Sequence, residues 1–154
     1  MSNLERKDQE RIYNKQPLKI GVVGFSEPKF NEITATVHLK SAFNAIQKAH
    51  GDQHYFIVVS GLTALGIPLL AYQEAVNRNW ETKGIACELA KDYECFPVDE
   101  EIIFGADWGD ESSIFLNDID ILVRVGGGNQ SMEETAAAHE KGIPVFEFDL
   151  EAQA

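Results

Sequence analysis

The sequence lacks any apolar run long enough to cross a bilayer, and it lacks an apolar core near its amino terminus. Its longest apolar stretches are about as long as a strand, whereas a membrane-spanning helix needs about 20 apolar residues. The first 17 residues are polar, which is not typical of a signal peptide. We therefore expect a cytoplasmic protein without a membrane partner. It would have a polar tail over residues 1–17 and a single domain over residues 18–154, a common domain size.

Cysteine and basic side chains are also scarce. Cys87 and Cys95 are the only cysteines and show no metal-ligand spacing. We expect two free thiols, with a disulfide across the short intervening loop as the alternative. The net charge of −12 argues against binding to a nucleic-acid backbone, which requires clustered Lys and Arg. A small anionic ligand is still compatible with this charge, because backbone amides at helix N-termini bind phosphate without basic side chains.

Three familiar signatures of enzymes are absent or incomplete. No serine lies in a GxSxG elbow, so acyl-transfer catalysis has little support. The four histidines are scattered and form no visible ligand set or triad: His38, His50, His54 and His139. The loop at residues 24–26 lacks the full GxGxxG fingerprint, which weakens an interpretation as an NAD-dependent dehydrogenase.

Short apolar runs alternate with segments of helical periodicity along the rest of the chain. The predicted strands are residues 19–24, 55–60, 84–89, 119–125 and 144–148, and the predicted helices are residues 34–50, 66–79, 114–117 and 131–141. The first helix would bury Val37, Ala42, Phe43 and Ile46 on one face. Residues 90–113 show no clear period. The alternation predicts a three-layer Rossmann-like α/β fold with a mostly parallel central sheet.

Three glycine-containing loops follow predicted strands and should meet at the carboxyl edge of the sheet. The residues that we expect to bind a ligand phosphate are Gly24, Phe25 and Ser26, then Ser60, Gly61, Thr63 and Gly66, and finally Gly126, Gly127, Gly128, Asn129, Gln130 and Ser131. Glycine lets backbone amides turn toward an anion, and three in a row indicate close approach by another group. In the structural alternative, Ser131 is a helix N-cap and forms a capping box with Glu134.

Residues beside these loops allow further hypotheses. Arg124 reaches either the ligand phosphate or, in the interpretation that we favour, a carboxylate at the sheet edge. A cluster of Asp107, Asp110 and Glu111 could bind Mg²⁺ together with a nucleotide, although such a cluster is more often a solvated loop. Trp108 either stacks on a base or fills the edge of the core. We therefore expect no resident metal or cofactor, with Mg²⁺ only as a companion of the ligand.

Residues 126–134, GGGNQSMEE, resemble the PGGxGTxxE motif of the LOG-type proteins, once described as lysine decarboxylases. Gly127, Gly128 and Glu134 match the motif and Ser131 replaces its threonine, whereas Gly126 and Gln130 depart from it. Residues 60–66 also resemble the loop after the second strand in this group. The similarity covers residues 19–148. The wider Rossmann-like superfamily includes DNA-processing-protein-like and molybdenum-cofactor-carrier-like members.

The resemblance implies a nucleotide-type small-molecule partner and a homodimer that pairs through helices. In LOG-type enzymes the motif glutamate acts with an arginine to hydrolyse the N-glycosidic bond of a nucleoside 5′-monophosphate. Glu134 is accordingly the candidate catalytic residue. The segment that would carry the arginine, residues 105–113, is acidic here and has none. The sequence therefore favours a binding or sensing protein, with a phosphoribohydrolase as the alternative.

Overall fold

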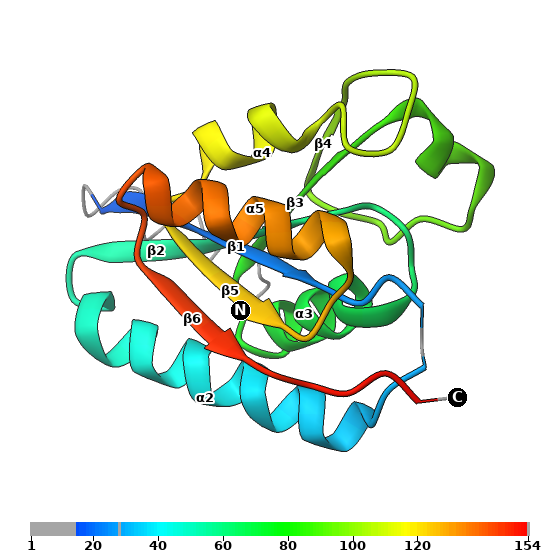
Figure 1. The fold of residues 1–154 in the computed structure, drawn as a ribbon. Helices are drawn as coiled ribbons and strands as arrows, with labels where there is room; N and C mark the ends of the chain where they lie inside the picture. The colour runs from blue at the N-terminus through cyan, green and yellow to red at the C-terminus, as the bar shows by residue number, and fades with distance from the viewer. Residues whose placement is uncertain (1–14, 28, 154) are drawn as a thin grey trace.

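The computed structural model describes residues 15–27 and 29–153. Within them, six parallel strands form one sheet of order β4-β3-β2-β1-β5-β6 (Figure 1). The strands are β1 (Gln16–Gly24), β2 (His54–Ser60), β3 (Glu81–Ala86), β4 (Glu100–Ile103), β5 (Ile121–Val125) and β6 (Val145–Phe148). The helices are α2 (Glu32–His50), α3 (Gly66–Asn77), α4 (Ser112–Asp118), α5 (Asn129–Glu140) and a short 3₁₀ helix, η1 (Glu88–Asp92). The predicted three-layer α/β fold is confirmed.

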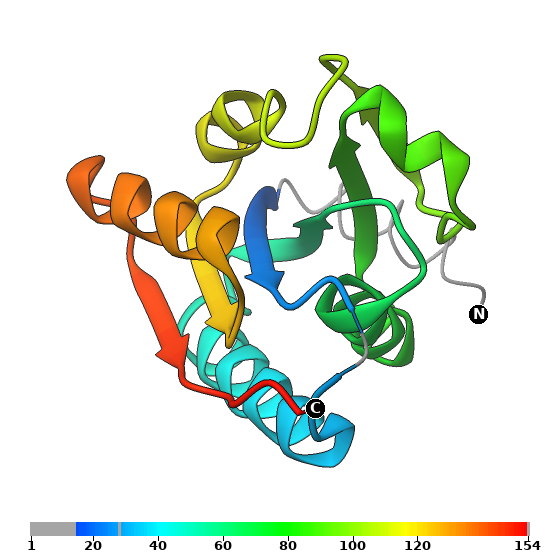
Figure 2. The same ribbon diagram turned by 45° about the vertical axis from the view of Figure 1, so that its right-hand side comes forward.

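Helices cover both faces of the sheet, with α2 and α3 on one side and α4 and α5 on the other (Figure 2). Successive strand residues point to opposite faces. Val22 of β1 accordingly packs in the cluster beneath α2 and α3, whereas its neighbour Val23 packs beneath α4 and α5. This two-sided burial explains why the strands are almost continuously apolar. Because all the described strands are parallel, their carboxyl ends lie at one edge of the sheet.

The predicted strands with apolar runs are confirmed, and most of them have shifted ends. Strand β1 begins at Gln16, so residues 16 and 17 of the expected tail belong to the sheet, and residues 1–14 lie outside the described residues. Strand β3 covers residues 81–86 rather than 84–89. The sequence does not predict the polar first half of β3 as a strand. Its buried Lys83 is neutralised by carboxylates that are distant in the sequence, Asp118 at 2.9 Å and Glu100 at 3.4 Å.

Strand β4 is absent from the prediction. Its sequence, EEII, lies at the edge of the sheet, and both glutamates are exposed. Charged side chains are common on edge strands because they discourage pairing with other chains. They also remove the apolar signal from which a strand is predicted.

Three helix starts differ from the prediction, and one of these helices, α4, begins at Ser112 rather than at residue 114. Helix α2 begins two residues early because the side chain of Asn31 caps it, accepting a 3.0 Å hydrogen bond from the Thr34 amide. Helix α5 begins at Asn129 with Gly128 as its N-cap. Ser131 therefore lies inside the helix and is not its N-cap, which contradicts the structural alternative of a capping box between Ser131 and Glu134.

Side-chain burial on α2 agrees with the prediction except at one position. Ala42, Phe43 and Ile46 of α2 are buried, whereas Val37 is 58% exposed. Both cysteines are free thiols, as predicted. No helix among the described residues combines the length and the apolar character that crossing a membrane requires.

Candidate functional site

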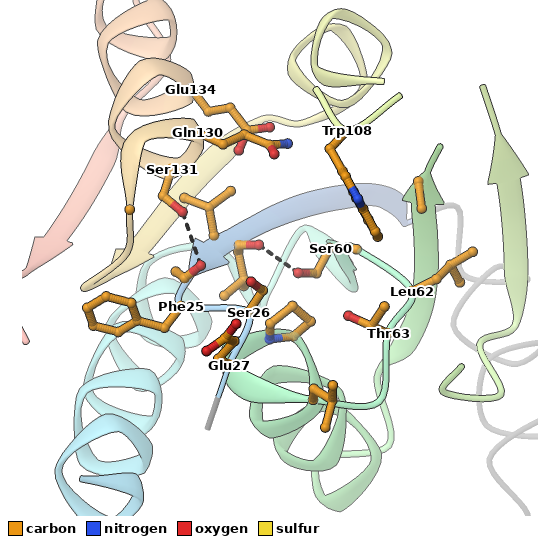
Figure 3. A pocket seen from close by; sticks show the side chains of 18 of the residues that line it. Phe25, Ser26, Glu27, Ser60, Leu62, Thr63, Trp108, Gln130, Ser131 and Glu134 are labelled. Carbon is orange, nitrogen blue, oxygen red and sulfur yellow. Dashed lines mark hydrogen bonds between the residues drawn. The ribbon is translucent and has the colours of Figure 1, made fainter. Parts of the chain in front are cut away.

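A pocket of about 650 Å³ lies at the carboxyl edge of the sheet, where the loops after β1, β2 and β5 come together (Figure 3). Most of the predicted site residues line it: Gly24, Phe25, Ser26, Ser60, Gly61, Thr63, Gly128, Asn129, Gln130, Ser131 and Glu134. Gly66, Gly126 and Gly127 are not among the residues that line this pocket. The three loops therefore meet as expected, although their glycines do not share one environment.

The three glycines outside the pocket lining are required by contacts within the chain. All three have positive φ, a backbone conformation that favours glycine. A Cβ on Gly66 would lie 2.3 Å from the Phe25 carbonyl oxygen, and one on Gly126 would lie 2.5 Å from the Phe25 ring. A Cβ on Gly127 would lie 2.6 Å from the Cβ of Ser131. The close approach indicated by the glycine run is therefore made here by Phe25 and Ser131 themselves.

Gly61 and Gly128 have a different environment. Among the described residues, no heavy atom lies within 4 Å of a Cβ placed on either one, and both line the pocket. Their backbone is thus accessible from the pocket without an intervening side chain. A ligand can approach the main chain closely at these two positions.

The N-terminus of α5 supplies unpaired donors beside Gly128. The first described hydrogen bond of this helix runs from the Met132 amide to the Gly128 carbonyl. Within residues 15–27 and 29–153, no acceptor is found for the amides of Asn129, Gln130 and Ser131. Such amides carry the partial positive charge of a helix N-terminus and form a ready site for an anion.

Two of the three serines in the predicted site, Ser60 and Ser131, are hydrogen-bonded to β1. The Ser60 hydroxyl donates to the Val22 carbonyl at 2.7 Å, and the Ser131 hydroxyl donates to the Gly24 carbonyl at 3.1 Å. Figure 3 shows both bonds at the base of the pocket. The Ser131 hydroxyl is thus directed at the backbone, and its donation to a ligand phosphate stays a prediction.

Two buried carboxylates form the side of the pocket between α4 and α5. Glu111 and Glu134, which we call the acidic pair, are 7% and 8% exposed. Ser112 donates to Glu134 Oε2 at 3.0 Å, and Gln130 donates to Glu111 Oε1 at 3.1 Å. Burial raises the pKa of Glu134 to about 7, and the charge of Glu111 adds to this shift while the Ser112 hydrogen bond opposes it.

The acidic loop before α4 does not have the arrangement of a metal site. The Asp110 carboxylate accepts hydrogen bonds from the amides of Ala106 and Asp107, each at 3.1 Å. Glu111 is occupied by Gln130 and by the Gly109 amide. In the described part of the chain, no three His, Cys, Asp or Glu side chains are grouped to hold a metal ion. Asp110 and Glu111 therefore organise their own loop, and binding of Mg²⁺ together with a ligand phosphate stays a prediction.

Arg124 forms ion pairs with carboxylates at the sheet edge. This is the interpretation that the sequence favours over contact with a ligand. Its guanidinium lies 2.9 Å from the Asp149 carboxylate and 3.6 Å from that of Glu147, and it donates to the Gly126 carbonyl at 3.1 Å. Arg124 is buried and does not line the pocket. It therefore joins the turn of the third loop to the segment that follows β6.

The pocket also contains Trp108, for which two roles are predicted, and three residues for which none is predicted: Tyr93, Ala152 and Gln153. Trp108 is 50% exposed, so it does not fill the core edge, and its ring centroid lies 6.0 Å from that of Tyr93. Both aromatic residues line the pocket. Ala152 and Gln153 reach it from beyond β6, where the Gln153 amide donates to the Lys29 carbonyl. Residues 90–113 have no period and residues 149–153 have no motif, so the sequence offers no signal for these positions apart from the aromatic side chains.

No family model and no curated protein matches the sequence. Similar solved structures include a molybdenum cofactor carrier protein from Chlamydomonas reinhardtii, which is 23% identical with a TM-score of 0.68 over 86% of this chain and 76% of that chain. The structural-genomics target TM1055 is 22% identical, with a TM-score of 0.64 over 83% of this chain and 72% of that chain. A molybdenum cofactor binding protein from the phototrophic bacterium Rippkaea orientalis is 18% identical, with a TM-score of 0.61 over 86% and 76%.

These similarities show the fold. The chain shares with these proteins a three-layer α/β fold built on a parallel sheet, and molybdenum cofactor carriers are among its structural neighbours.

Proposed function

We propose that this chain binds a nucleotide or nucleotide-derived phosphate ligand and acts as a binding or sensing protein. The observation that carries the proposal is the N-terminus of α5, where the amides of Asn129, Gln130 and Ser131 have no acceptor among the described residues. Gly61 and Gly128 leave open space in the pocket beside them. A phosphate at this position would bind to backbone amides without a basic side chain.

The rest of the pocket is suited to the remainder of such a ligand. Its volume of about 650 Å³ lies within the range of small-molecule and cofactor sites. Trp108 and Tyr93 offer aromatic surfaces for a flat ring, since base–aromatic stacking tolerates any base. The neighbours described as carrying or binding molybdenum cofactor add that cofactor to the candidate ligands.

Calorimetric titration tests this proposal. We expect at least one nucleoside 5′-monophosphate to bind, and the corresponding nucleoside without its phosphate to bind more weakly. Inorganic phosphate should compete with the nucleotide. The proposal is wrong if no phosphate-bearing compound binds.

A nucleoside-monophosphate phosphoribohydrolase is the second candidate. It is favoured by Glu134, which lies in the pocket at the family's motif position and has a pKa of about 7. A carboxyl group with such a pKa can donate or accept a proton near neutral pH. Residues 105–113 nevertheless contain no arginine, and Arg124 is bound to Asp149.

Incubation with nucleoside monophosphates, followed by chromatography for free base, distinguishes this candidate from simple binding. If base is released, Glu134→Gln should abolish the release. Glu133→Gln, which removes an exposed carboxylate from the same helix, is the matched control. Release that persists unchanged in Glu134→Gln would exclude Glu134 from the mechanism.

We also propose, from the sequence resemblance, that two copies of the chain pair through helices. Ile33 and Val37 of α2 are 80% and 58% exposed, and they lie one turn apart on the same helix face. Sedimentation equilibrium should give twice the chain mass of 17.1 kDa. A monomeric mass at micromolar concentration would contradict the pairing.

A further inference from the structure

The acidic pair has no positively charged partner within the described pocket. Its hydrogen-bond donors are all neutral, namely the Ser112 hydroxyl, the Gln130 side-chain amide and the Gly109 backbone amide. Lys29 is the only basic residue among those described as lining the pocket, and it lies 3.7 Å from the carboxylate of Glu27. Nothing on this side of the pocket therefore neutralises Glu111 and Glu134.

This arrangement determines which ligand groups can lie beside the pair. Burying a carboxylate is costly unless a donor or an opposite charge compensates it, and two neighbouring carboxylates repel each other as well. A ligand group with N–H or O–H donors, above all a cationic one, would relieve both costs. A negatively charged group would increase them.

The acidic pair also lies at a defined place relative to the unpaired amides. The Cα atoms of Asn129 and Glu134 are separated by about 7.5 Å along the axis of α5, and the Glu134 side chain extends back to a hydrogen bond with the Gln130 side chain. Figure 3 shows Gln130 and Glu134 extending from this helix toward the side where Trp108 lies, whereas Ser131 points toward the loop after β1. The pocket thus has one end suited to an anion and another end suited to a donor.

We propose that the acidic pair selects the end of the ligand that lies away from the phosphate, and that this end presents N–H or O–H donors and carries no negative charge. The phosphate end rests on the proposed function, and the selection by the pair is additional to it. Glu111 is then a specificity-determining residue, in the segment where the resembling enzymes carry an arginine.

Two small phosphate esters that differ in their end groups test this inference. Phosphoethanolamine ends in an ammonium group and phosphoglycolate in a carboxylate, and ethanolamine and glycolate are their counterparts without phosphate. At pH 8 we expect the protein to bind phosphoethanolamine about tenfold more tightly than phosphoglycolate, as for a hydrogen bond to a charged group. Ethanolamine should likewise bind more tightly than glycolate.

Matched variants assign this preference to the acidic pair. Glu111→Gln and Glu134→Gln should each reduce the preference for the ammonium end by about threefold or more. Glu133→Gln removes the same formal charge from an exposed position on α5 and should leave the preference unchanged. Thermal unfolding and near-ultraviolet circular dichroism of each variant verify that it is folded.

The outcomes separate the two proposals. Equal affinity for the two esters, or an equal loss in Glu133→Gln, would overturn the selection by the acidic pair, and so would equal affinity for ethanolamine and glycolate if neither ester binds. The phosphate site itself fails if phosphoethanolamine binds no more tightly than ethanolamine. In that case a retained preference for ethanolamine over glycolate would still support the acidic pair.

Discussion

Helices α3 and α5 both begin after a glycine-containing loop at the carboxyl edge of the sheet, yet their N-termini differ. At α3, the Ile67 amide donates to the Phe25 carbonyl at 2.8 Å, and Gly66 is packed against the same oxygen. At α5, the first amides have no acceptor in the described part of the chain, and Gly128 faces open space. The same sequence signal thus produces a packed loop in one place and a candidate anion site in the other.

Gly66→Ala should disrupt the packed loop before α3 and have the largest effect on stability. Its φ of +63° costs an alanine about 1–2 kcal/mol, and the overlap with the Phe25 oxygen adds a packing cost of about 1–3 kcal/mol. We expect the free energy of unfolding to fall by about 3 kcal/mol in urea titrations. Gly61→Ala in the same loop meets no neighbour and should cost less than about 1 kcal/mol. Equal losses in the two variants would refute the steric explanation.

Glu134→Gln, in the second turn of α5, should have the next largest effect on stability. The pKa of Glu134 rises from 4.5 to about 7 on folding, so the folded protein retains a proton that the unfolded chain releases. Stability should therefore fall as the pH rises from 4.5 to 7, by up to about 3 kcal/mol. The glutamine variant lacks this titration and should be more stable than the parent at pH 8 by about 2 kcal/mol.

Urea titrations at pH 5 and pH 8 measure this difference. The Glu133→Gln variant should keep most of the pH dependence of the parent, because Glu133 is exposed and its charge is the smallest of the causes that raise the pKa of Glu134. An unchanged slope in Glu134→Gln would show that burial does not hold the proton on this carboxyl group.

How far the sequence predicts the fold depends on where each strand finds its partners. Apolar runs predict β1, β2 and β5 because these strands are covered on both faces. The polar start of β3 is stabilised by contacts between Lys83 and Asp118, and Asp118 lies 35 positions further along the chain, so no local pattern reveals it. At β4 the exposed Glu100 and Glu101 hide the strand for a similar reason.

The site shows the same limit. Glycine at strand ends identifies all three loops, because the carboxyl ends of parallel strands share one edge. It does not separate Gly66 from Gly128, since that distinction depends on where the Phe25 carbonyl lies. Likewise, the acidic character of residues 105–113 is visible in the sequence, but the contact between Glu111 and Gln130 requires α4 and α5 to be folded.

Gly128→Ala tests the N-terminus of α5, where the backbone faces open space. The residue has a φ of −98°, and a Cβ at this position would meet no neighbour, so alanine should reduce the free energy of unfolding by less than about 1 kcal/mol. The added methyl group would nevertheless project where a phosphate approaches the amides of α5. We expect an affinity for adenosine 5′-monophosphate about tenfold lower, or about 1.4 kcal/mol, in calorimetry. Unchanged affinity would place the phosphate elsewhere.

Trp108→Ala should have the smallest effect and separates the ring of the ligand from its phosphate. Because Trp108 is half exposed, its removal should cost little stability. Loss of one stacking surface should weaken the binding of adenosine 5′-monophosphate by about 1 kcal/mol, or about fivefold in affinity. Inorganic phosphate has no ring, so its affinity should not change. If the affinities for both ligands fell equally, Trp108 would act by supporting the acidic loop before α4. Anion binding at the N-terminus of α5 would then depend on that loop as well as on the helix.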